Sequence, residues 1–279
     1  GYSALAAILT GDGNVAIGAN AMDDTDAHAN TGASENNVFV GFHSGGGTWA
    51  ATQTDNSIGI GAYALYGALD NVDGTVAIGG NALTALISGA NNTAVGFNAL
   101  AEATTASNNV ALGYRALDAI VGQQDVDNVS AGHYNIAIGV DSMGGVNAGT
   151  HATALTDSNI AIGTNALIGA SFVGANLELK GNVVMGHHAM ASTSNNAQTG
   201  TIAIGYQSLN ALTSGAGNTA VGYEALSTAT DGSHMVAIGY QAFKDAAPTG
   251  GGAVNESVAI GYLAGSEMTT GDGVVYIGG

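Results

Sequence analysis

The chain of 279 residues has little or none of several residue types that usually cross-link a domain, stiffen its backbone or give it positive charge. It has no cysteine, one proline and three basic residues, which are Arg115, Lys180 and Lys244. The lack of cysteine excludes disulfides and thiolate metal sites, and the near absence of proline excludes a collagen helix. With a formal net charge of −18, the surface should repel nucleic acid and anionic membranes. No apolar run reaches the roughly 18 residues that a membrane-spanning helix needs.

Glycine and small aliphatic residues are abundant instead. There are 45 glycines, and 46% of the residues are apolar, which argues against disorder. A nine-residue unit recurs along the chain, and we call its central residue the repeat glycine: Gly1, Gly18, Gly41, Gly61, Gly79, Gly96, Gly113, Gly139, Gly163, Gly186, Gly205, Gly222, Gly239, Gly261 and Gly278. The shortest spacing is seventeen, as from Gly205 to Gly222, and the longest adds nine to it. The sequence therefore predicts an all-β, parallel β-solenoid in which a minimum coil of this length is decorated by loops.

We expect one repeat array over residues 1–279, with about fourteen coils. The first unit begins at its repeat glycine, Gly1, and the last ends near its own, Gly278. Both ends therefore fall within a repeat, and we expect the natural protein to continue in both directions.

The residues before the repeat glycine have the pattern of a short strand. A β-branched residue stands three places before it, a large apolar residue one place before it, and alanine two places before it in ten of fourteen copies. Successive strand residues point to opposite faces. We expect the valines and isoleucines to pack inside the coil, against a Leu or Met four places after the glycine, and a partner chain to cover the alanines. A second short strand is expected in the other half of each coil.

Asparagine opens the unit in eight copies: Asn14, Asn37, Asn92, Asn109, Asn135, Asn159, Asn182 and Asn218. Stacked in neighbouring coils, their amides should form a hydrogen-bonded ladder along the solenoid axis. An aromatic residue often follows the repeat glycine, as Tyr206 and Tyr223 do, and His187 takes this place once. Such a column usually packs between coils, and a sugar-binding platform is the alternative.

Four segments carry a resemblance to a known family: NTAVGFNAL (92–100), TIAIGYQSL (201–209), NTAVGYEAL (218–226) and SVAIGYLAG (257–265). They resemble the YadA-like head repeats of trimeric autotransporter adhesins and the related NTAxGYxAL arrays of phage tail-fibre-like proteins. The resemblance covers essentially the whole chain. It implies a left-handed β-roll, a homotrimer, and a place in the head or shaft of a fibre at a cell or virion surface. The adhesin heads repeat over a shorter unit than the minimum coil of this chain, so the fibre arrays are the nearer match.

The acidic residues are concentrated in the longer loops. Asp70 and Asp73, and likewise Asp125 and Asp127, place oxygen ligands in tight loops, as Ca²⁺ prefers. No complete EF-hand spacing occurs, so these four are weak calcium candidates beside the ordinary interpretation of solvated loop charge. No other cofactor is expected.

We expect no enzyme, because neither a Ser-His-Asp set nor paired carboxylates stand apart from the repeat, and no phosphate-binding loop has its lysine. The leading hypothesis is a structural or adhesive segment of a homotrimeric extracellular fibre. The alternatives are a non-trimeric extracellular filament or sheath subunit and, with less support, an ice-binding solenoid. The expected partner is the chain itself. A host receptor or glycan would bind outside this segment, and neither nucleic acid nor membrane insertion is expected.

Overall fold

The computed structural model describes residues 1–5, 11–23, 34–49, 53–120, 132–145, 155–169, 178–193, 198–245, 255–268 and 272–279. The chain divides into two compact units, Gly1–Asn135 and Ile136–Gly279. Over the described ranges there is no helix, and every strand pairing is parallel. The prediction of an all-β, parallel β-solenoid is thereby confirmed.

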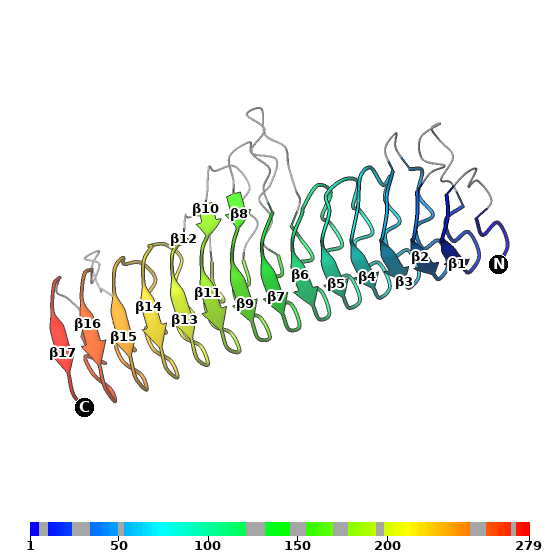
Figure 1. Ribbon diagram of the computed structural model, residues 1–279. Helices are drawn as coiled ribbons and strands as arrows, with labels where there is room; N and C mark the ends of the chain where they lie inside the picture. The colour runs from blue at the N-terminus through cyan, green and yellow to red at the C-terminus, as the bar shows by residue number, and fades with distance from the viewer. Residues whose placement is uncertain are drawn as a thin grey trace. The chain divides into compact units, whose positions relative to one another are not determined.

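In the first unit, six strands follow one another in chain order, each paired with the next (Figure 1). The alignment is the one that the repeat predicts, since the residues before one repeat glycine pair with those before the next, as Ala77 does with Ala94. The strands are β1 (Val15–Ile17), β2 (Val38–Val40), β3 (Ile58–Ile60), β4 (Val76–Ile78), β5 (Thr93–Val95) and β6 (Val110–Leu112).

The second unit continues the pattern with eight strands: β7 (Ile136–Ile138), β9 (Ile160–Ile162), β11 (Val183–Met185), β13 (Ile202–Ile204), β14 (Thr219–Val221), β15 (Val236–Ile238), β16 (Val258–Ile260) and β17 (Val275–Ile277). A separate small sheet has the order β12-β10-β8 and comprises β8 (Leu155–Asp157), β10 (Glu178–Lys180) and β12 (Gln198–Thr199).

The prediction of two strands in every coil is wrong for most of the described coils. Among the described coils, only those with β8, β10 and β12 have a second strand, and outside them there is one isolated bridge, Asp70↔Ser88. The half-turns still stack through backbone hydrogen bonds, as when the N–H groups of Ile87 and Ser88 both donate to the Thr104 carbonyl. The second strands lie in coils that are longer than the minimum, whereas neighbouring coils of minimum length, such as Gly79 to Gly96 and Gly96 to Gly113, have none.

The predicted orientation of the strand is also wrong. The alanine two places before the repeat glycine points into the coil and is fully buried, as are Ala77 and Ala94, whereas the residues on either side of it are partly exposed. Inside, these alanines lie with a second buried alanine and a buried Leu or Met from the turn, such as Ala82 and Leu83. So short a coil is too narrow to hold Ile or Val on one side and Leu on the other, so the small side chain takes the inner position.

A large residue at the inner position needs space from its neighbours. Phe39 replaces the inner alanine of β2 and is fully buried. The next coil has Gly59 at the equivalent place, where a Cβ would lie 2.5 Å from the Phe39 Cδ1 atom. In the turn after β2, Gly45 stands where most coils have Leu or Met, and a Cβ there would lie 2.7 Å from the same ring. Trp49 closes the cluster, with its ring 6.0 Å from that of Phe39.

Candidate interaction surface

The outward face of the main strands is an apolar surface in both units, and we call it the aliphatic face. It consists of the residues three places and one place before each repeat glycine, which are Val, Ile, Thr, Leu or Met in every strand. These side chains are only partly covered: Ile60 and Ile238 are each 39% exposed. A partly exposed strip of mainly aliphatic side chains is a candidate interaction site.

The repeat glycines allow the coils to stack closely at the corner where each strand ends. Gly163 has a φ of 134°, and a Cβ there would lie 2.5 Å from the carbonyl oxygen of Gly186 in the next coil. Both the backbone conformation and the backbone contact exclude a side chain. From Gly18 onward the described repeat glycines share the left-handed conformation, with φ between 121° and 144°.

The predicted asparagines lie inside the coils and bond along the solenoid axis. Asn109 shows the pattern: its Nδ2 donates to the Gly132 carbonyl at 2.7 Å and to the Oδ1 of Asn92 at 3.1 Å. Its Oδ1 accepts from the backbone N–H of Asn135 at 2.9 Å. In the hydrogen bond to the half-turn, the asparagine side chain is therefore the donor and a backbone carbonyl is the acceptor. Bonds from Nδ2 to a half-turn carbonyl recur at Asn14, Asn37, Asn92, Asn159, Asn182 and Asn218.

Sequence analysis missed a second conformational column, five places before the repeat glycine. In all fourteen coils this residue has a left-handed backbone, from Gly13 at 72° to Glu256 at 52°. Glycine or asparagine, which adopt this conformation most readily, occupies ten of the fourteen places. That enrichment is the signal that could have identified the turn.

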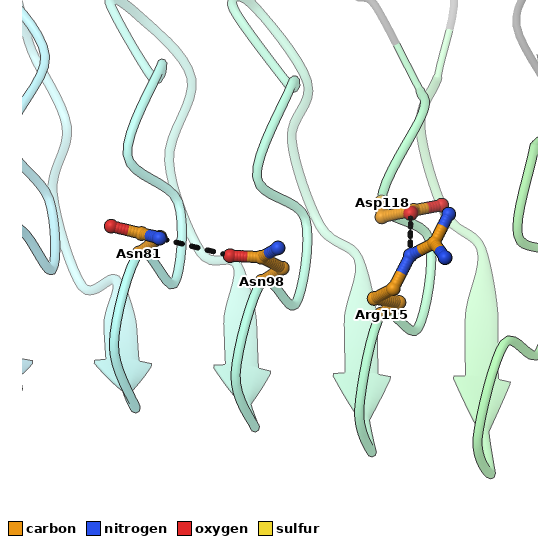
Figure 2. A network of polar contacts seen from close by, with 4 residues as sticks. All are labelled: Asn81, Asn98, Arg115 and Asp118. Carbon is orange, nitrogen blue, oxygen red and sulfur yellow. Dashed lines mark hydrogen bonds and ion pairs between the residues drawn. The ribbon is translucent and has the colours of Figure 1, made fainter.

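A polar column lies on the turn two places after the repeat glycine. Figure 2 shows its members after β4, β5 and β6: the Asn81 Nδ2 donates to the Asn98 Oδ1 at 3.0 Å, and the Arg115 Nε lies 2.6 Å from the Asp118 carboxylate. In the second unit, Asn165 pairs with the Nε2 of His188 at 3.1 Å. Burial, and then the neighbouring His187, lower the pKa of His188.

The same column contains an ionic network in the second unit. The Glu224 carboxylate accepts hydrogen bonds from Lys244 at 3.0 Å and from Gln241 at 2.7 Å, both from the next coil. Hydrogen bonding to Lys244 is the main cause that lowers the pKa of Glu224, and the carboxylate in turn raises the pKa of Lys244. The neighbouring Glu224 carboxylate also raises the pKa of Tyr223.

The aromatic residues after the repeat glycines form stacks on the surface. In the second unit His187, Tyr206, Tyr223, Tyr240 and Tyr262 stack one on the next, with ring centroids 5.1 to 5.5 Å apart and ring planes within 16° of parallel. Each inner ring therefore has a neighbour on both faces. A sugar-binding platform needs free ring faces, so the geometry favours the packing role.

The weak calcium candidates are only partly described. Asp73 uses one carboxylate oxygen to accept the backbone N–H of Asp55 at 2.8 Å, and Asp70 makes a backbone bridge to Ser88. Asp125 and Asp127 lie outside the described residues. Among the residues that are described, no group of three or more His, Asp or Glu side chains could hold a metal ion.

Comparison with known proteins identifies no relative: no protein-family model matches the chain, and neither does any curated protein. A search of the described segments for a helix with the length and hydropathy to cross a membrane finds none. The functional argument therefore depends on the surface itself.

Proposed function

We propose that this chain is a non-catalytic structural or adhesive segment of a homotrimeric fibre, in its head or shaft, displayed outside the cell or on a virion. The observation that supports this proposal is the apolar, uncharged aliphatic face, through which copies of the chain would associate. The number of chains, the left-handed roll and the location follow from the resemblance to adhesin heads and tail-fibre arrays.

Charge distribution supports contact between copies at this face. The chain has 21 acidic residues, yet none stands at either position of the aliphatic face in the fourteen strands. Two copies that meet through their acidic loops bring like charges together, which costs free energy, whereas two aliphatic faces meet without charge.

The size of the face supports the same conclusion. A strand of three residues is ~10 Å long and neighbouring strands lie ~4.8 Å apart, so the eight main strands of the second unit present on the order of 400 Å². Covering these partly exposed Ile and Val side chains favours association by ~25 cal/mol per Å² of apolar surface removed from water, against which the entropy lost on association must be set.

Repetition favours a second copy of this chain over an unrelated partner. The aliphatic face repeats once per coil, and a matching surface must present apolar groups at the same spacing. A neighbouring copy in parallel alignment meets this condition at every coil.

The test is the mass of the assembly in solution, measured by light scattering and native mass spectrometry, for the wild type and the double variant Ile238→Glu/Ile260→Glu. We expect a trimer for the wild type and monomers for the variant, because two carboxylates would be buried against a neighbour. Thr230→Glu is the matched control, since it adds a carboxylate at an exposed half-turn of the same unit. It should leave the trimer intact.

A monomeric wild type, or a double variant that keeps the wild-type mass with native circular dichroism, would refute association through this face. Open-ended polymers in place of trimers would favour the alternative of a filament or sheath subunit, in which the same face joins copies without closed symmetry.

A further inference from the structure

The stacked tyrosines of the second unit have a property that the fibre proposal does not use. Tyr206, Tyr223, Tyr240 and Tyr262 occupy four consecutive coils, in the turns after β13, β14, β15 and β16 (Figure 1). Their ring centroids are 5.1, 5.1 and 5.4 Å apart in succession. We call these four residues the tyrosine ladder.

We propose that the tyrosine ladder is a site of oxidative modification, where a haem peroxidase and hydrogen peroxide couple neighbouring tyrosines into dityrosine and so join adjacent coils covalently. In the coupling, each of two phenols loses one electron and its hydroxyl proton. The two phenoxyl radicals form a bond between ring carbons ortho to the oxygens. Each of those carbons then returns its hydrogen to an oxygen as a proton, and one hydrogen peroxide is reduced to two waters.

Proximity makes coupling within one chain faster than coupling between chains. Two radicals on separate molecules must meet by diffusion, whereas ladder neighbours are held at contact distance by the stacked backbones. Groups held in this way react at effective concentrations many orders of magnitude above those of free solutes. An oxidised ring also always has a neighbour with which to share or pass on the radical.

The ladder is accessible to an oxidant. Tyr206 is 41% exposed and Tyr262 is 62% exposed, so electrons can be removed at the surface without unfolding. The inner rings expose their edges, where the ortho carbons and the hydroxyl lie, because the faces are covered by stacking.

The experiment treats the whole chain with a haem peroxidase and hydrogen peroxide, then follows dityrosine fluorescence and maps fragments by mass. Cleavage after glutamate leaves Tyr206 and Tyr223 in one fragment and separates Tyr240 from Tyr262. We expect the first fragment to become lighter by two hydrogen atoms, and the fragments that contain Tyr240 and Tyr262 to become joined. Denaturing electrophoresis should show these products at the mass of a single chain.

Substitutions separate the ladder from general tyrosine oxidation. Tyr223→Phe leaves one neighbouring tyrosine pair in the ladder and should lower the yield of ladder cross-links about twofold, since only pairs in contact couple efficiently. Tyr134→Phe is the control: Tyr134 is 64% exposed but lies outside the ladder, so this change should leave the ladder yield unaltered. In the first unit, Phe97 stacks on Tyr114 with centroids 5.9 Å apart, and Phe97→Tyr should create a new cross-link there.

The proposal is overturned if ladder cross-links form only between chains, or if Tyr223→Phe leaves their yield unchanged. It is also overturned if no ladder fragment changes mass at a peroxide dose that couples free tyrosine. Joined fragments confined to one chain, with the new link in Phe97→Tyr, would support it.

Discussion

The packing around Phe39 predicts that Gly59→Ala lowers the free energy of unfolding of the wild type but raises that of a Phe39→Ala variant. Gly59→Ala restores the alanine that most coils have at the inner position of the strand, and no left-handed φ prevents it. The new methyl would lie 2.5 Å from Cδ1 and 2.8 Å from Cε1 of the Phe39 ring. Phe39 and Trp49 are both fully buried, so the ring has no free space to move into. Overpacking of this kind lowers the free energy of unfolding by about 1–3 kcal/mol.

In a Phe39→Ala background the same substitution should be favourable. Phe39→Ala alone removes a buried ring and should cost about 3–5 kcal/mol. Adding Gly59→Ala then fills part of the cavity and restricts the unfolded chain, which should regain roughly 1 kcal/mol. The coupling free energy between the two positions is therefore about 2–4 kcal/mol, which double-mutant cycles resolve.

Urea unfolding followed by circular dichroism and tryptophan fluorescence measures these free energies. Trp49 is the only tryptophan, and its ring lies against Phe39, so its emission reports on this cluster. If Gly59→Ala costs the same in both backgrounds to within about 0.5 kcal/mol, the two sites do not interact and the packing argument is refuted. Ser44, whose Oγ would lie 2.9 Å from the new methyl, does not explain a cost, since Ser142 bonds Ala161 in the same way.

Other substitutions test the columns that hold the coils together. Asn109→Leu leaves buried backbone groups without partners and should cost about 3–5 kcal/mol in urea unfolding; Asn109→Ser should cost clearly less, and equal losses would show that the amide contributes nothing. Gly222→Ala, at a φ of 144° and against the backbone of the next coil, should lower Tm by several degrees or prevent folding. Gly200→Asn should leave Tm nearly unchanged, since nothing lies within 4 Å of its Cβ position and its φ of 61° suits asparagine. Because the pKa of Glu224 is lowered by Lys244, its contribution to stability is present above the ordinary carboxyl range and is lost as pH falls through the folded-state pKa. The difference in Tm between wild type and Glu224→Gln should therefore shrink on acidification, and a difference that does not vary with pH would contradict the ion pair.

The periodic part of this fold is readable from the sequence because each coil repeats the same steric demands. The repeat glycines could be identified from their recurrence alone. Glycine is kept at these positions because a side chain, for example at Gly163, would meet the backbone of the next coil. The parallel alignment of the strands followed from the same count. The asparagines were also apparent, because a polar residue in eight copies of an otherwise apolar unit needs a common partner inside the coil.

The side of the strand that faces inward was not readable in the same way. Alternation shows that Val76 and Ala77 point to opposite faces, but both residues are apolar, so hydropathy does not distinguish inside from outside. The width of the coil decides the matter, and that width depends on a turn in which Asn81 and Leu83 both adopt left-handed conformations. Leucine as a residue type does not indicate a left-handed backbone. Stacking against the neighbouring coil imposes this conformation.

The half-turns lay beyond sequence reasoning for a different reason. Their composition predicted a second strand in every coil, but the second strands of the described coils occur only where residues are added to the minimum unit. β8, β10 and β12 each end three residues before a main strand, in coils of 24, 23 and 19 residues.

The paired substitutions of large and small residues have a consequence for folding. Neighbouring coils carry nearly the same core residues, so a strand that pairs one coil too far along would lose little contact energy at most positions. Phe39 fits only beside Gly59 and Gly45, and in the second unit the Phe243 ring occupies the space of a side chain at Gly265. If β2 paired with β4 instead of β3, the Phe39 ring would lie against Ala77 in place of Gly59. Phe39 and Phe243 thus act as aromatic markers that penalise misaligned coils, and a chain without these markers should refold to a mixture of shifted solenoids.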